Sequence, residues 1–364
     1  MTNLPPVPEP RVSNTQTLQK ALKWIKSFWF PTTINMHLLV GAETINTLVN
    51  KVSGVYSNPE EYLNSLVEYN KILNQGQGQK VAIVTGANSG IGYVTAEYLY
   101  KAGYYVILAC RNEQKANEAI EKIEINKNQD GHLKFIKFDA NSLQSANEFV
   151  KEFEKLDKKL DLLVNNAGIM MPPYAQTENF VESQIGTNFL SHYYLTDQLM
   201  SHLSSDAKII NLSSLASFFT NEFSLNQITN KDAYSPVGNY SQSKLAMTMF
   251  TYYLNSKLQS SDITVYSAHP GMVKTNLYTL DLGAKIANIV GKVTFKEVEA
   301  GTFTTLRCAL LPPSKDHGKD SLYYADELPF YPPVSAVDET AVNELIDWAK
   351  ETIRTNGFEL KSDL

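Results

Sequence analysis

Strand-like and helix-like segments alternate along the chain from residue 79 onwards. Runs rich in β-branched and other apolar residues predict strands at 81–85, 104–110, 133–139, 160–164, 208–212 and 263–268, and a shorter one at 321–325. Stretches of helical periodicity separate them, and a last helix is predicted over 338–354. Because strands joined through helices pair in parallel, the sequence predicts an α/β fold, with a doubly wound parallel sheet of about seven strands and helices on both faces.

The first 78 residues follow a different pattern. Four prolines within positions 5–10 predict a mobile tail over residues 1–16. Apolar residues then recur at helical spacing from Leu18 to Trp29, and again from Tyr62 to Leu73 behind Asn58, which is expected to cap the helix. The glycine-bearing run 74–79 predicts a linker. We therefore expect a helical N-terminal extension over 17–78, a sheet domain over 79–355 and a C-terminal tail over 356–364.

Composition excludes several classes of protein. The chain has 32 basic and 38 acidic residues and no sustained basic block, so no nucleic-acid partner is expected. Cys110 and Cys308 are too few for a disulfide framework and lack metal-ligand spacing, so we expect no metal site and a reducing, cytoplasmic setting. The longest apolar stretch, 28–49, is broken by polar residues and is not expected to span a membrane. Residues 1–16 do not resemble a signal peptide.

A glycine-rich turn follows the first predicted strand and leads directly into a helical stretch. Its sequence is Thr85-Gly86-Ala-Asn-Ser89-Gly90-Ile91-Gly92. Glycines at a strand-to-helix turn let the backbone approach a pyrophosphate, which free N–H groups and the helix dipole stabilise. The spacing differs from G-x-G-x-x-G, but its place in the alternation predicts a dinucleotide site.

The end of the second strand indicates which dinucleotide binds. An NAD site usually places an acidic residue about 20 residues after the glycine turn, to bind the ribose 2′-hydroxyl. Here that region holds Cys110 and Arg111. Arg111 could pair with a 2′-phosphate, which favours NADP(H) over NAD(H). The alternative is an exposed arginine at a strand end.

Two Tyr-x-x-x-Lys spacings, Tyr240–Lys244 and Tyr253–Lys257, are candidates for proton transfer. A lysine one helical turn from a tyrosine places an ammonium beside the phenol and lowers a pKa that starts near 10. Such a phenol can act as a general acid or base. Tyr240 follows a turn and starts its helix, whereas Tyr253 lies 13 residues further along and faces a different side. We therefore favour Tyr240.

The order of these motifs resembles that of the short-chain dehydrogenase/reductase family. Four further segments show the family's pattern: Asn165-Asn166-Ala-Gly168, Asn188-Phe-Leu-Ser-His192, Tyr240-Ser-Gln-Ser-Lys244 and Pro270-Gly-Met-Val273-Lys-Thr275. The resemblance covers residues 79–355, and within the family it is to the branch of retinol dehydrogenases and WW-domain oxidoreductases. It implies a Rossmann-like sheet and NAD(P)-dependent hydride transfer between nicotinamide and a carbonyl or alcohol.

The resemblance also implies a role for each matching residue. Tyr240 would be the general acid or base beside Lys244. Ser214 would polarise the substrate oxygen, with Ser213 as the alternative, and Asn188 would join a proton relay through water. Asp139 would reach the adenine amine, and Val273 and Thr275 the nicotinamide carboxamide. The full set implied for the cofactor is Gly86, Ser89, Gly90, Ile91, Gly92, Arg111, Asp139, Asn166, Tyr240, Lys244, Val273 and Thr275.

Substrate and partners are expected to involve apolar surfaces. Leucines, isoleucines and a valine between 277 and 290 could roof a pocket for a lipophilic carbonyl or alcohol such as retinal, a steroid or a lipid-derived aldehyde, or could pack a helix onto the sheet. Residues 18–45 could contact a membrane peripherally, at the endoplasmic reticulum or a lipid droplet, or dock onto the catalytic domain or a second subunit. Relatives in the family commonly pair through the helices flanking the fourth and fifth strands, which implies a homodimer.

A different class of function is a catalytically weak cofactor-binding or scaffolding protein on the same fold. Loss of the tyrosine or the lysine would indicate it. Both Tyr240 and Lys244 are present, so the sequence favours an enzyme.

Overall fold

The computed structural model describes residues 6–11, 32–125, 131–274, 295–313, 322–362 and 364. Its centre is an eight-stranded sheet in the order β3-β2-β1-β4-β5-β6-β7-β8. The strands are β1 (Val81–Thr85), β2 (Tyr105–Cys110), β3 (His132–Lys137), β4 (Leu160–Asn165), β5 (Leu203–Leu212), β6 (Thr264–His269), β7 (Tyr323–Ala325) and β8 (Leu328–Phe330). All neighbours are parallel except β7 and β8. The predicted doubly wound sheet is therefore confirmed, with one strand more than the seven expected.

Strand β8 was not predicted because its turn has no sequence signature. The tight turn from β7 to β8 consists of Asp326 and Glu327, which have φ angles of 48° and 67°. Glycine or asparagine normally takes such left-handed positions. Strand β5 also begins five residues earlier than predicted, at Leu203, because its first half is polar and partly exposed.

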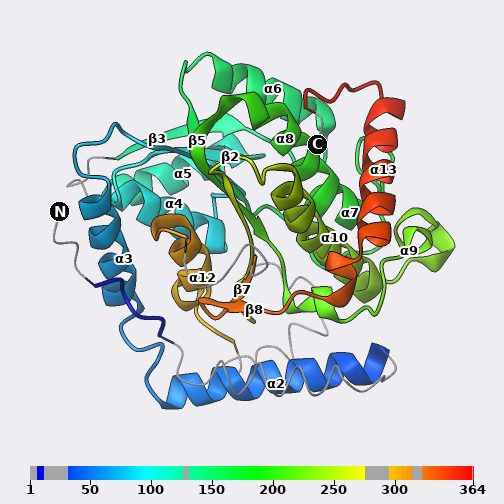
Figure 1. Cartoon of the computed structure of the whole chain (residues 1–364), viewed down its shortest axis with the longest axis horizontal. Helices are drawn as coiled ribbons and strands as arrows, with labels where there is room; N and C mark the ends of the chain where they lie inside the picture. The colour runs from blue at the N-terminus through cyan, green and yellow to red at the C-terminus, as the bar shows by residue number, and fades with distance from the viewer. Residues whose placement is uncertain (1–5, 12–31, 126–130, 275–294, 314–321, 363) are drawn as a thin grey trace.

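Helices cover both faces of the sheet (Figure 1). One face packs against α4 (Gly90–Lys101), α5 (Glu113–Glu124) and α12 (Val298–Leu310). The other packs against α6 (Leu143–Glu154), α8 (Ser191–Leu199), α10 (Pro236–Lys257) and α13 (Glu339–Thr355). Residues of β1 to β6 point into the two cores, so both faces of this parallel part of the sheet are buried, whereas Tyr323 of β7 and Phe330 of β8 join a smaller third cluster with Leu39 of the N-terminal extension.

Short helices connect these elements. They are α7 (Ser183–Ile185), the π-helix η1 (Gly186–Leu190), the 3-10 helices η2 (Met200–His202) and η3 (Leu215–Phe218), α9 (Leu225–Thr229), and the 3-10 helices η4 (Lys231–Ala233) and η5 (Val334–Val337). The last predicted helix, 338–354, corresponds to α13.

The N-terminal extension contributes α2 (Thr32–Val52) and α3 (Pro59–Leu73). Helix α3 confirms the predicted stripe, and its Tyr62 and Leu66 join the same core as strand β1. Asn58 precedes α3 in a left-handed conformation and makes no side-chain cap hydrogen bond, so the predicted cap is wrong. Its φ of 51° turns the chain into the helix without the extended geometry that side-chain capping uses. The helix predicted from Leu18 to Trp29 lies outside the described residues.

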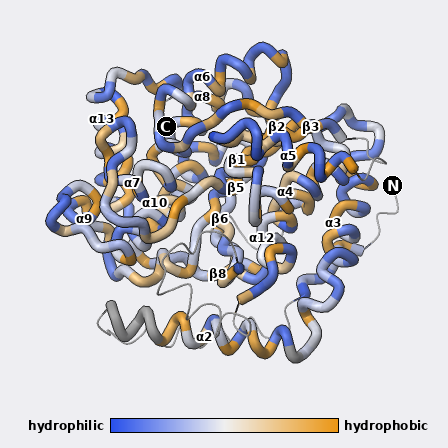
Figure 2. Tube along the Cα trace, turned by 180° about the vertical axis from the view of Figure 1, so that it is seen from behind, coloured by the Kyte–Doolittle hydropathy of each residue, from blue (hydrophilic) through white to orange (hydrophobic). Residues whose placement is uncertain are grey.

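Helix α2 was not predicted, because several of its polar side chains are buried and several of its apolar side chains are exposed, the opposite of an ordinary surface helix. Its buried face carries Glu43, Asn46, Thr47 and Asn50, each at most 5% exposed. Its outer face carries the exposed apolar residues Leu38, Ile45, Leu48 and Val49. Figure 2 shows α2 at the rim of the molecule, with hydrophobic and hydrophilic segments alternating along it. Among the described residues, no helix is long and apolar enough to cross a bilayer.

Both ends of the described chain are held by the domain. Residues 6–11, expected to belong to a mobile tail, instead donate and accept hydrogen bonds: the Arg11 amide donates to Glu327 Oε1 (3.1 Å), and Arg307 donates to the Pro8 carbonyl (2.6 Å). Prolines lack an N–H group but keep a carbonyl acceptor, so this segment can bond without forming an element. At the other end, the amides of Lys361 and Ser362 donate to Asp197 of α8 (2.8 and 3.0 Å).

Candidate active site

A cavity of about 370 Å³ lies at the carboxyl ends of the central strands. Ten of the residues predicted for the site line it: Gly86, Ser89, Gly90, Ile91, Gly92, Arg111, Asp139, Asn166, Tyr240 and Lys244. Asn188, Ser214 and Val273 lie outside its lining, and Thr275 lies outside the described residues. The order of strands reverses between β1 and β4, and ligands of open α/β sheets bind at such a switch point.

The glycine turn has the backbone shape that close approach to a dinucleotide requires. Gly86 and Gly90 have φ angles of 67° and 57°, which other residues adopt only with strain. A Cβ atom on Gly92 would lie 2.5 Å from both Asn166 Nδ2 and the Gly86 carbonyl oxygen. Helix α4 begins here, and the Ser89 side chain accepts no cap hydrogen bond from it. The turn therefore fits a pyrophosphate held by backbone N–H groups at a helix N-terminus.

Thr85, at the end of β1, holds the Asn-Asn-Ala-Gly segment beside this turn. Its Oγ1 accepts hydrogen bonds from the amides of Asn166 and Ala167, both at 2.8 Å. The same Oγ1 lies 3.0 Å from His192 Nε2, while His192 Nδ1 lies 3.1 Å from the Asn188 carbonyl oxygen. Burial lowers the pKa of His192 to about 4, so the ring is neutral and Thr85 donates to Nε2. Sequence reasoning missed both Thr85 and His192, although each stands within a quoted motif.

Arg111 has a carboxylate neighbour that the sequence did not suggest. Its Nε lies 4.0 Å from Asp139 Oδ2, and its side chain is 74% exposed. Asp139 also accepts a hydrogen bond from the Asn141 amide (3.0 Å). No acid ends strand β2 itself, but β2 and β3 are adjacent, so their following residues meet at the cavity rim. Arg111 can therefore bind a phosphate while Asp139 reduces its net positive charge.

Helix α10 positions the tyrosine and lysine. Ser235 caps it by accepting from the Gly238 amide, and Tyr240 and Lys244 are both 6% exposed. Lys244 Nζ lies 5.9 Å from the Tyr240 ring centroid and donates to the Leu212 carbonyl (2.9 Å). Burial lowers the pKa of Lys244 to about 8. The arrangement places the Lys244 amino group beside the Tyr240 ring at the cavity.

The second tyrosine motif lies elsewhere. Tyr253 faces a groove between α10 and α13, with Lys257 Nζ 5.3 Å from its ring centroid and Lys350 Nζ 3.4 Å from its hydroxyl. Burial raises the pKa of Tyr253 to about 12. Neither its position nor its pKa suits proton transfer at the cavity.

The two serines after β5 use their hydroxyl groups differently. Ser213 donates to the Lys244 carbonyl (3.0 Å) and contacts Thr248 Oγ1 (2.8 Å), so its proton is engaged in packing α10 onto the sheet. Ser214 accepts from the Ala216 amide (3.2 Å), a contact that does not use its hydroxyl proton. Ser214 can therefore donate to a substrate oxygen without breaking that bond, although its side chain is outside the cavity lining.

Asn188 lies in the π-helix η1, and its side chain is committed to the backbone. Its Oδ1 accepts from the Ile169 amide (2.8 Å), and its Nδ2 donates to the Ile169 carbonyl (3.0 Å) and to Ser243 Oγ (2.9 Å). A Cβ on Gly168 would lie 3.0 Å from Asn188 Oδ1 and 3.7 Å from Lys244 Nζ. In this arrangement the side chain supports the cavity wall, and the expected relay through water stays a prediction.

The Val273 side chain packs in the core, and its backbone pairs with a neighbouring segment. Its side chain is 4% exposed and lies against α12, where a Cβ on Gly301 would come within 2.4 Å of Val273 Cγ2. Its backbone forms a parallel bridge with Lys296. The apolar residues expected to roof a substrate pocket, 277–290, lie outside the described residues.

Comparison with known proteins agrees with this geometry. The model of a family described as short chain dehydrogenase matches residues 80–281. The chain belongs to this family. Among similar short-chain dehydrogenases, the chloroplastic TIC 32 A of Brassica napus is 34% identical over 75% of this chain and 88% of its own length. Human polyprenol dehydrogenase is 34% identical over 68% of this chain and 78% of its own, and human retinol dehydrogenase 13 is 41% identical over 54% and 60%.

A solved structure supports the fold of this short-chain dehydrogenase. An uncharacterised protein from Mycobacterium paratuberculosis superimposes with a TM-score of 0.60, 29% identity, and coverage of 76% of this chain and 94% of its own. The expected family, its retinol dehydrogenase-like branch and the Rossmann-like fold are thereby confirmed. As a short-chain dehydrogenase, the protein is an NAD(P)-dependent oxidoreductase.

Proposed function

We propose that this short-chain dehydrogenase uses NADP(H) to interconvert a lipophilic carbonyl and its alcohol, with Tyr240 as the general acid or base. The observation that carries the proposal is the single cavity that unites the glycine turn, Arg111 and the Tyr240–Lys244 pair. The bound nicotinamide supplies hydride to the carbonyl carbon, or accepts it from the alcohol. The remaining requirement is a proton at the oxygen, which the protein provides.

Residues of α10 and of the segment after β5 provide this proton and stabilise the oxygen. The Lys244 ammonium lies one helical turn from Tyr240, and its positive charge stabilises the phenolate that forms when the proton leaves. Tyr240 then donates a proton to the carbonyl oxygen in reduction and takes it back in oxidation. Ser214 donates a hydrogen bond to the same oxygen, where negative charge develops. Asn166 and the glycine turn, which line the same cavity, hold the dinucleotide.

The preference for NADP(H) is proposed to depend on Arg111. An arginine pairs with a phosphate through charge-assisted hydrogen bonds, but Arg111 is exposed and shares its charge with Asp139. We therefore expect Arg111→Ala to raise the KM for NADPH only about tenfold, the lower part of the range for hydrogen bonds to charged groups. The KM for NADH should stay unchanged. Steady-state kinetics with both cofactors measure this, and equal changes for the two would refute the assignment.

A lipophilic substrate is supported by the relatives' names, which include polyprenol dehydrogenase and several retinol dehydrogenases. We expect NADPH-dependent turnover of retinal and of a medium-chain aldehyde to exceed that of a small ketone, because apolar surface in the pocket binds the longer chains. The kcat/KM values of the three substrates, measured under the same conditions, test this. Preference for the small ketone would contradict a lipid-like substrate.

Peripheral membrane contact is proposed for the outer face of α2. Leu38, Ile45, Leu48 and Val49 are exposed on a helix whose polar side chains face inward, and apolar side chains in such a stripe bind the acyl boundary of a bilayer. We expect the full-length protein to co-float with liposomes, and Ile45→Glu combined with Leu48→Glu to abolish flotation while leaving turnover of a water-soluble substrate intact. Absence of flotation by the unmodified protein would remove the idea.

A homodimer through the helices flanking β4 and β5 stays a prediction, and these helices are partly covered by the chain itself. Helix α8 is covered by the chain's own C-terminal residues, with Tyr193 donating to the Leu364 carbonyl (3.1 Å), and α10 is packed against α13. Such a dimer would need this cover to move. A monomer in sedimentation velocity measurements would reject it.

A further inference from the structure

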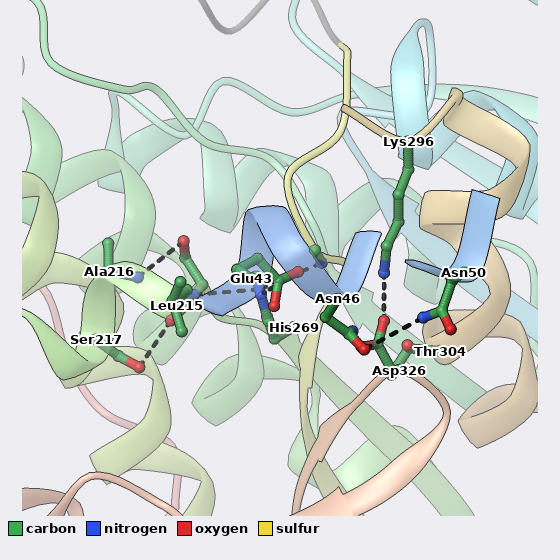
Figure 3. A network of polar contacts seen from close by, with 12 residues as sticks. Glu43, Asn46, Asn50, Leu215, Ala216, Ser217, His269, Lys296, Thr304 and Asp326 are labelled. Carbon is green, nitrogen blue, oxygen red and sulfur yellow. Dashed lines mark hydrogen bonds and ion pairs between the residues drawn. The ribbon is translucent and has the colours of Figure 1, made fainter. Parts of the chain in front are cut away.

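The buried polar face of α2 meets the loop that follows β6, close to the candidate active site (Figure 3). We call residues His269–Val273 the β6 loop. Its Pro270 lines the cofactor cavity, and its Val273 belongs to the segment proposed to face the nicotinamide. Figure 3 shows Glu43 of α2 facing His269, with Asn46 of the same helix directed to Asp326 and Asn50 donating to Asn46 Oδ1. The N-terminal extension therefore reaches the wall of the cavity.

His269 ties the β6 loop to the residue after Ser214. Its Nδ1 lies 3.1 Å from the Leu215 amide and 3.4 Å from the Gly271 amide, and both amides donate to it. An Nδ1 that accepts hydrogen bonds carries no proton, so the neutral ring must carry its proton on Nε2. Burial, with the charges of Lys296 and Lys244, lowers the pKa of His269 to about 3, which keeps the ring neutral.

The Glu43 carboxyl group is the polar group that faces the Nε2 side of His269. Glu43 Oε1 lies 3.8 Å from His269 Nε2, and both residues are about 5% exposed. Within the described part of the chain neither atom has a hydrogen-bond partner, so each is the polar group that the other faces. The Glu43 carboxylate also accepts from the Met272 backbone amide. One side chain of α2 thus lies against His269 at the start of the β6 loop and Met272 near its end.

A buried ion pair supports the loop from its other side. Lys296 Nζ pairs with Asp326 Oδ1, and Asn46 of α2 donates to Asp326 Oδ2 (2.6 Å). The Lys296 amide donates to the Met272 carbonyl (2.8 Å), and a Cβ on Gly271 would lie 2.5 Å from Lys296 Nζ. The β6 loop is therefore held between Lys296 and Glu43. Glu43 belongs to α2, and α2 is connected to Lys296 through Asn46 and Asp326.

We propose that Glu43 is a positioning residue for the cofactor site, acting through His269 and the Met272 amide to fix the β6 loop. The inference rests on the proposed function, because it takes the β6 loop to border the nicotinamide. It assigns to α2 a part in binding and turnover besides any contact with a membrane. The charged and titratable groups facing Glu43 are His269 of β6, Lys296, Asp326 of the β7–β8 turn, and the phenols of Tyr56 and Tyr323.

The test compares two substitutions of Glu43. Glu43→Met keeps the side-chain volume but removes the carboxyl group, so the Met272 amide loses its hydrogen-bond acceptor and His269 Nε2 loses the polar group that faces it. We expect NADPH binding, measured by fluorescence titration, to weaken about tenfold, as expected for leaving a buried polar group unsatisfied. We expect kcat to fall as well, because His269 also holds the residue after Ser214. Glu43→Gln keeps an acceptor oxygen and should bind NADPH nearly as the unmodified protein does.

Glu327→Gln is the matched control. Glu327 is also a buried carboxylate whose pKa burial raises to about 7, but it contacts Tyr62 and Arg11 and makes no described contact with the β6 loop. This variant should change thermal stability at most, with NADPH affinity unaltered. If Glu43→Met and Glu327→Gln weaken NADPH binding equally, or Glu43→Met binds NADPH normally, Glu43 has no positioning role.

A measurement on the unmodified protein covers the case in which Glu43→Met does not fold. Nitrogen-15 NMR of the histidine rings should show His269 as the neutral Nε2–H tautomer at neutral pH, and an Nδ1–H tautomer would overturn the proposal. Neither NADPH titration nor NMR needs turnover. If no carbonyl is reduced while these two results hold, the proposed function fails and the assignment of Glu43 to the cofactor site survives. If Tyr240→Phe loses turnover but Glu43→Met behaves normally, only the present inference fails.

Discussion

Tyr240→Phe is expected to lower kcat by roughly 10²- to 10⁴-fold, the usual contribution of a positioned general acid. The phenylalanine ring keeps the packing of a residue that is 6% exposed on helix α10, so the fold should survive. NADPH binding should change little, because the glycine turn and Arg111 at the other end of the cavity are untouched. Single-turnover reduction of retinal, with NADPH titration alongside, separates the two effects.

Tyr253→Phe is the natural control for this experiment. Tyr253 has the same Tyr-x-x-x-Lys spacing in the same helix but faces the groove beside α13. Its removal should leave kcat near that of the unmodified protein. Equal rates for the unmodified protein and Tyr240→Phe would exclude Tyr240 as the acid, and a loss confined to Tyr253→Phe would transfer the role to the second motif.

Asp326→Asn is expected to reduce the free energy of unfolding by roughly 3–5 kcal/mol, the cost of leaving one partner of a buried ion pair uncompensated. Lys296 and Asp326 are both nearly inaccessible to water. Burial alone would raise the pKa of Asp326, but the charge of Lys296 together with the hydrogen bonds from Lys296 and Asn46 holds that pKa below its usual range. Asparagine tolerates the left-handed backbone of this turn, so the loss of stability measures the effect of removing the charge and not of backbone strain. Urea unfolding monitored by circular dichroism gives the value.

The double variant Asp326→Asn with Lys296→Met tests the cause of that loss. Removing both charges also removes the desolvation penalty of the lone ammonium, so stability should recover most of the way. A double variant less stable than Asp326→Asn alone would show that hydrogen bonding to Asn46, and not the unpaired charge, dominates at this site.

The sheet could be predicted because its strands are buried on both faces and read as continuous apolar runs between helices. Elements without that contrast were missed. The β7–β8 turn has two acidic residues where glycine is usual. Helix α2 places Glu43 and Asn46 inside and Ile45 outside, and periodicity arguments assume the opposite. Its polar face is compatible with burial only because partners from distant strands meet it, and local sequence carries no sign of those partners.

The site could be predicted where the motif itself sets the geometry, as in the glycine turn and the Tyr240–Lys244 spacing. Residues that act through contacts across the fold were not predicted. No role was predicted for His192 or His269. His192 connects Thr85 at the end of β1 to the Asn188 carbonyl in η1, and His269 at the end of β6 accepts from the Leu215 amide after β5. The pairing of Arg111 with Asp139 likewise depends on the adjacency of β2 and β3, which the strand sequences alone do not state.

Helix α3 shares its hydrophobic core with β1, and Tyr62 packs edge to face on Phe303 of α12 with ring centroids 4.9 Å apart. The family match begins at residue 80, after this helix. Trimming the chain to the family's limits would thus cut through one continuous interior, leaving apolar rings and the acids of the β7–β8 turn open to water. The minimal unit for expression and assay is longer at its start than sequence similarity suggests.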